Sequence, residues 1–67
     1  MNIEQKLCNE GCVQITEDDE VKLFKSFRTH NLIAVWKNQI VWESGTKFDE
    51  SIPKEIKETI KKLIYFG

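Results

Sequence analysis

The sequence predicts a small α+β domain in which a three-stranded antiparallel sheet carries two or three helices. The first observation is a pair of apolar runs, 32–36 and 40–44, rich in β-branched and aromatic residues and separated by a short polar break, as is typical of a β-hairpin. The second is a stretch, 52–65, whose apolar side chains recur at helical spacing. The third is the length of 67 residues, which predicts a single small globular domain over 1–67.

The first element is expected to be a short helix over residues 2–10. Asn2 suits its N-cap, and Gln5 stands three residues later, as in a capping box. Gly11 follows where a helix commonly ends, because glycine adopts a left-handed backbone without strain. A helix of about two turns is marginal in isolation, so it must dock on another element.

A short strand over residues 12–15 is expected next, with Val13 and Ile15 on one face. It ends at a cluster of acidic residues, 17–20, that follows Thr16.

Two interpretations compete for the segment 17–29. As a helix, the segment is capped by Thr16, with acidic residues in its positive first turn and basic residues near its negative end. As a strand, it alternates Val21, Leu23 and Phe27 with polar residues. The order of the charges favours the helix and the Phe and Val content favours the strand. Our prediction is the helix.

The hairpin turn decides where the two tryptophans point. A two-residue loop at Asn38-Gln39 places Trp36 and Trp42 on opposite faces, and a three-residue loop over 37–39 places both on one face. We predict the two-residue loop, because a three-residue loop normally needs glycine at its left-handed position. Neither face of the hairpin is cleanly polar, so both faces must be covered.

The C-terminal segment 52–65 is predicted to be an amphipathic helix. Ser51 suits the N-cap, and Pro53 is tolerated in the first turn. The apolar positions that share one side are Ile52, Ile56, Ile60, Leu63 and Ile64.

The composition is globular and almost neutral. The net charge is −1 with 31% charged and 40% hydrophobic residues, so no global field favours nucleic acid or an anionic membrane. No apolar run approaches the roughly 18 residues of a membrane span, and no signal peptide is visible, so we expect a cytoplasmic protein without membrane contact. Lys, Ile, Asn and Glu are abundant and Ala34 is the only alanine, which fits an AT-rich coding sequence from a low-GC bacterium or its phages.

The residues that usually carry catalysis or bind metals are sparse. Cys8 and Cys12 stand at C-x3-C spacing, and we expect free thiols that behave as small hydrophobes. A metal site would need two further ligands, and His30 is the only histidine. The three glycines are isolated, so there is no phosphate-binding loop. We therefore expect no enzyme, no cofactor and no metal.

Aromatic residues are the strongest functional signal. Two tryptophans, one tyrosine and four phenylalanines are more than so small a core can bury, and exposed aromatic side chains often mark interfaces. For the two tryptophans, either both lie in the core or one lies at a partner interface. The predicted partner-binding residues are Trp36, Trp42, Phe24, Phe27, Tyr65 and Phe66.

These features predict a non-enzymatic protein–protein interaction module, such as a small regulator or inhibitor of a host protein encoded by a phage or mobile element. Its partner would be another protein or a second copy of the chain. The alternative is a nucleic-acid-binding regulator that surrounds Trp36 with basic side chains, against which the near-neutral charge argues. The basic residues of that alternative are Lys22, Lys25, Arg28 and Lys37.

Overall fold

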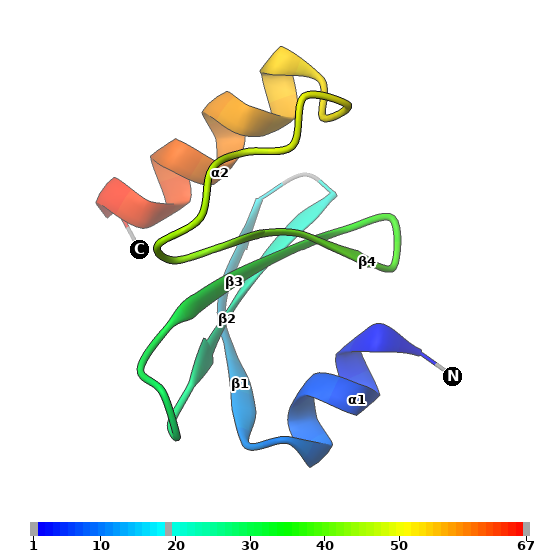
Figure 1. Ribbon diagram of the computed structural model, residues 1–67, viewed down its shortest axis with the longest axis vertical. Helices are drawn as coiled ribbons and strands as arrows, with labels where there is room; N and C mark the ends of the chain where they lie inside the picture. Colours follow the sequence, from blue (N-terminus) through cyan, green and yellow to red (C-terminus); the bar gives the residue numbers. More distant parts are fainter. Residues whose placement is uncertain (1, 19, 67) are drawn as a thin grey trace.

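The computed structural model describes residues 2–18 and 20–66, and it confirms the α+β class: one antiparallel sheet lies between two helices (Figure 1). The predicted number of strands is wrong, since the sheet has four strands in the order β1-β2-β3-β4. The elements of this part of the chain are α1 (Ile3–Asn9), β1 (Cys12–Asp18), β2 (Val21–Ser26), β3 (Leu32–Trp36), β4 (Gln39–Glu43) and α2 (Lys54–Phe66).

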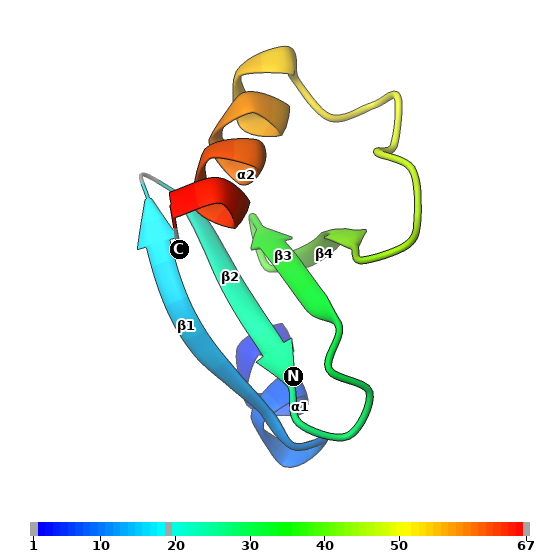
Figure 2. The same ribbon diagram turned by 90° about the vertical axis from the view of Figure 1, so that its left-hand side faces the viewer.

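Each face of the sheet is covered by its own helix, as the two-sided apolar hairpin requires. Figure 2 shows α2 in front of the sheet and α1 behind it, so we call the two sides the α2 face and the α1 face. The buried residues of the α1 face are Leu7, Cys12, Phe24, Ile33 and Val35. Those of the α2 face are Val21, Leu23, Ala34, Ile60 and Leu63.

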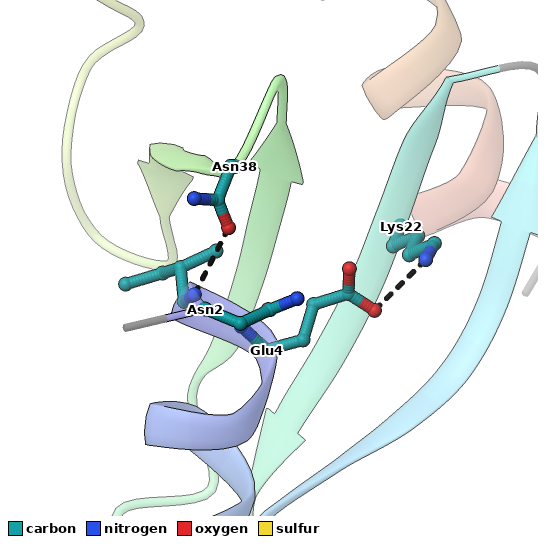
Figure 3. A network of polar contacts seen from close by, with 5 residues as sticks. Asn2, Glu4, Lys22 and Asn38 are labelled. Carbon is teal, nitrogen blue, oxygen red and sulfur yellow. Dashed lines mark hydrogen bonds and ion pairs between the residues drawn. The ribbon is translucent and has the colours of Figure 1, made fainter.

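The N-terminal helix forms where the sequence predicts it. The Asn2 side chain accepts a hydrogen bond from the Glu4 amide at 2.7 Å, and Gly11, at φ 87°, follows the end of the helix. Two polar contacts fasten α1 to the sheet (Figure 3). The Ile3 amide donates to Asn38 Oδ1 at 2.9 Å, and Lys22 Nζ lies 2.8 Å from Glu4 Oε1. The short helix is thus tied to both β2 and the β3–β4 turn.

The predicted helix over 17–29 is wrong, because this segment ends β1 and then forms β2. Val21, Leu23 and Phe24 are buried, since β2 lies between β1 and β3 and contributes side chains to both faces. A surface helix buries only one stripe, whereas a central strand covered on both faces buries nearly every residue. This burial outweighs the local charge order that favoured a helix.

The first strand is longer than the predicted 12–15 and contains a β-bulge. Its register with β2 shifts between Gln14 and Thr16, which leaves Ile15 as the extra residue. Val13 and Ile15 are both exposed. The apolar positions of this strand therefore do not form the core face that alternation suggests.

The predicted hairpin turn is displaced by one residue, and the tryptophans lie on the same face. Lys37 and Asn38 both have positive φ, 51° and 59°, which is the two-residue turn that matches the twist of paired strands. A bulge in β4 then pairs Ala34 with Trp42, so Trp42 joins Trp36 on the α2 face. The predicted opposite placement is wrong because the bulge shifts the register by one residue.

The C-terminal helix begins at Lys54, two residues after the predicted start, and Ser51 is not its cap. The Asp49 carboxylate instead accepts hydrogen bonds from the Ser51 amide at 2.9 Å and from its hydroxyl at 3.0 Å. The Pro53 carbonyl accepts from the Ile56 and Lys57 amides. The predicted apolar stripe is confirmed, since all five of its residues are buried or half-buried.

The turn before α2 predicts a pH dependence of stability. The amide of Ser51 and then its hydroxyl lower the pKa of Asp49. A carboxyl group whose pKa is lower in the folded chain adds stability above its unfolded pKa of ~3.9, and this stability is lost as pH falls through the folded value. The Asp49→Asn variant is therefore expected to have a lower melting temperature than wild type near neutral pH. Its melting temperature should also fall less steeply than that of wild type between about pH 5 and 2. Thermal melts across that range measure it, with the neighbouring exposed Glu50→Gln as control; identical pH profiles for wild type and Asp49→Asn would contradict it.

Candidate interaction surface

The structure separates the predicted partner-binding aromatics into buried and exposed groups. Phe24 is 1% exposed in the α1-face core, so it is not part of the accessible surface considered below. Phe27 is 60% exposed, and Tyr65 near the end of α2 is exposed as well. The side chain of Phe66 lies outside the described part of the chain.

Both tryptophans are half-buried on the α2 face, with their indole N–H groups donating within the chain. Trp36 Nε1 donates to Glu20 Oε2 at 3.2 Å, and the Lys37 ammonium lies 4.6 Å from the Trp36 ring centroid. Trp42 Nε1 donates to the Thr46 carbonyl at 3.1 Å. The Trp42 ring stacks on that of Phe48, with centroids 5.6 Å apart. These contacts hold both indoles against the domain, and part of each tryptophan stays exposed.

Three of the exposed apolar side chains lie at or next to β1, at one edge of the sheet. Val13 pairs with Lys25, and the Phe27 amide donates to the Gly11 carbonyl at 3.2 Å, so Phe27 continues the line of β2 beside β1. Because side chains alternate along paired strands, Val13 and Lys25 share the face on which Leu23 lies beneath α2. Phe27 follows directly after β2, in the turn that leads to β3.

We name the edge patch as Val13, Ile15 and Phe27. Val13 is 48% and Ile15 43% exposed, and both lie on β1, the strand at one edge of the sheet. The sequence pointed to Phe27 through its aromatic side chain. It missed Val13 and Ile15, because alternating apolar residues in a short strand normally indicate a core face.

The charges along this edge differ between its two ends. Glu17 and Asp18 lie at the end of β1, and Glu20 follows in the turn to β2. Lys25 lies opposite Val13 at the other end. A Cβ atom at Gly11 would lie 3.8 Å from Arg28 Cγ, so the Arg28 side chain also borders that end.

An open groove of about 320 Å³ lies at the border of the α1 face. Its floor includes the buried residues Cys12 and Ile33, and Glu10, Arg28 and Glu43 line its sides. Among the described residues, no group of three or more His, Cys, Asp or Glu side chains could hold a metal ion. Cys8 and Cys12 are free thiols, the first exposed and the second buried. The mixed charges of the groove favour no one class of ligand.

The basic residues of the nucleic-acid alternative do not form one surface. Lys22 pairs with Glu4 of α1, and this hydrogen bond is the main cause of its raised pKa. Lys25 lies three residues along the same strand, on the opposite face. Lys37 lies over the Trp36 ring at the hairpin turn. A continuous phosphate-binding stripe around Trp36 is therefore not assembled from these side chains.

No family model, curated protein sequence or solved structure matches the chain. Within residues 2–18 and 20–66, no helix is both long enough and apolar enough to cross a membrane.

Proposed function

We propose that this protein is a non-enzymatic protein–protein interaction module that binds its partner through the edge patch. The observation that carries the proposal is the exposure of three apolar side chains at one unpaired strand edge: Val13 and Ile15 lie on β1, and Phe27 is hydrogen-bonded through its amide to Gly11, just before β1. Exposed apolar groups that cluster on a small domain, bordered by charged residues, are typical of protein interfaces.

An edge strand also suggests how a partner would bind. An extended segment can add to an exposed sheet edge, with main-chain hydrogen bonds supplying affinity and alternate side chains supplying specificity. This way of binding suits a small regulator or inhibitor of a host protein, because strand addition requires only an edge strand and a few apolar side chains that contact the partner. The basic residues of the nucleic-acid alternative do not lie together on one surface, so the structure gives that alternative no support.

Site-specific photo-crosslinking in the native host tests the proposal. Phe27 is replaced by p-benzoylphenylalanine, and Ile40 is replaced in the same way as a control. Ile40 is 46% exposed on β4 at the opposite edge of the sheet, so both probes start from accessible apolar positions. We expect a discrete protein adduct from position 27 and none from position 40.

The mass of the adduct separates a second copy of the chain from a different protein. Equal labelling from both positions, or no adduct from position 27 in a folded protein, would overturn the proposal. A folded Phe27→Ser variant that competes as well as wild type against the labelled protein would also count against it.

A further inference from the structure

We infer that the partner at the β1 edge is a second copy of this chain, bound by antiparallel pairing of the two β1 strands across a two-fold axis. This inference rests on the proposed function as an interaction module and names the partner of the same surface.

The backbone of β1 is suited to such pairing. Hydrogen-bonded pairs alternate along antiparallel strands, and the Gly11–Phe27 bond places one such pair at Gly11 and the next at Val13. The N–H and C=O groups of Gln14, an exposed residue, therefore point away from β2 toward the open side of the strand, whereas Cys12 on the same side is only 5% exposed. A second strand would accept and donate at Gln14.

The charges make this edge complementary to itself in only one orientation. Glu17, Asp18 and Glu20 lie at one end of β1, and Lys22, the cation beside them, already pairs with Glu4. At the other end, Lys25 lies opposite Val13 and Arg28 borders Gly11, with Glu10 and Glu43 on the groove that Arg28 lines. Antiparallel pairing brings each acidic end to Lys25 and Arg28 of the other copy.

Parallel pairing would place like charges beside each other, which disfavours it. The acidic end also discourages pairing with strands that lack a matching basic end. A two-fold interface uses the same surface on both copies, so an edge that carries both the acidic and the basic partner is suited to self-association.

The pairing would also bury the edge patch. Val13 and Ile15 lie on the strand that forms the interface, and Phe27 borders it through its hydrogen bond to Gly11. The apolar groups that α2 leaves exposed would thus be covered by the same event that satisfies the strand edge.

Sedimentation equilibrium at increasing protein concentration tests the inference. We expect wild type to dimerise, and Ile15→Lys to weaken the dimer at least tenfold, because it places a charge at the two-fold interface. Ile40→Lys, with nearly the same exposure on the opposite edge, is expected to dimerise like wild type. Equal weakening by both variants would overturn the inference.

A charge exchange keeps the test decisive even if single variants perturb the fold. One variant carries Glu17→Lys with Asp18→Lys, and the other carries Lys25→Glu with Arg28→Glu. Each is expected to be monomeric in isolation, and their equimolar mixture is expected to form a one-to-one heterodimer. In wild type, hydrogen exchange at the Gln14 amide should slow as concentration rises.

A wild-type chain that stays monomeric at millimolar concentration would overturn the inference, as would a mixture of the two charge variants that forms no heterodimer. The proposed function would survive that result if position 27 still crosslinked to a different protein, and it would fail only if that adduct were also absent.

Discussion

Replacing Ile60 with alanine is expected to lower the free energy of unfolding by roughly 2–5 kcal/mol. Ile60 is 0% exposed and packs among Val21, Leu23 and Ala34, where α2 meets the centre of the sheet. The change removes buried apolar surface and leaves a cavity that the rigid sheet fills poorly. Because a domain of this size rarely has more than ~3–5 kcal/mol of core stabilisation, we expect a largely unfolded variant at room temperature.

Urea denaturation followed by far-ultraviolet circular dichroism measures this loss. The matched control is Lys62→Ala, an exposed position on the same helix, for which we expect a change within about 0.5 kcal/mol. An unchanged denaturation midpoint for Ile60→Ala would show that α2 does not pack on the sheet through this side chain.

Phe24→Ala is expected to cost about 3–5 kcal/mol, because it empties the centre of the α1-face core. Phe24 is among the largest fully buried side chains, and it packs with Leu7, Ile33 and Val35 beneath the short helix. Its removal should also release α1, which has little intrinsic stability at seven residues.

Phe27→Ala is the matched control, since it makes the same chemical change three residues along the chain at an exposed position. We expect it to alter the free energy of unfolding by no more than about 0.5 kcal/mol while reducing crosslinking or self-association. Equal destabilisation by the two variants would contradict the strand assignment, because a helix over this segment would place both phenylalanines on one face.

Local signals in the sequence determined the two helices and the existence of the hairpin. Asn2 and Gly11 mark the ends of α1 through backbone effects that act within a few residues. The apolar stripe of α2 and the alternating runs around the turn are likewise periodic over short distances. Such signals are readable because residues within a few positions of one another set them, although packing on the sheet supplies most of the stability of the helices.

The tertiary structure decided the role of the segment after Thr16. Its charge order is compatible with a helix, and only the presence of β1 and β3 on both sides of β2 makes a strand more stable. The same pairing buried Phe24 and left Phe27 exposed, which separated a core residue from a candidate binding residue. Burial depends on partners distant in the chain, so composition and local pattern do not determine it.

Register was the other property that only the tertiary structure decided. The positive φ of Lys37 and Asn38 sets the turn, and the bulge in β4 moves Trp42 to the face of Trp36. The bulge in β1 similarly leaves Ile15 exposed on the sheet edge. A shift of one residue moves a side chain to the other face of a sheet. The sequence by itself therefore determined that both faces needed to be covered, and the long-range pairing of strands determined which apolar residues remained exposed.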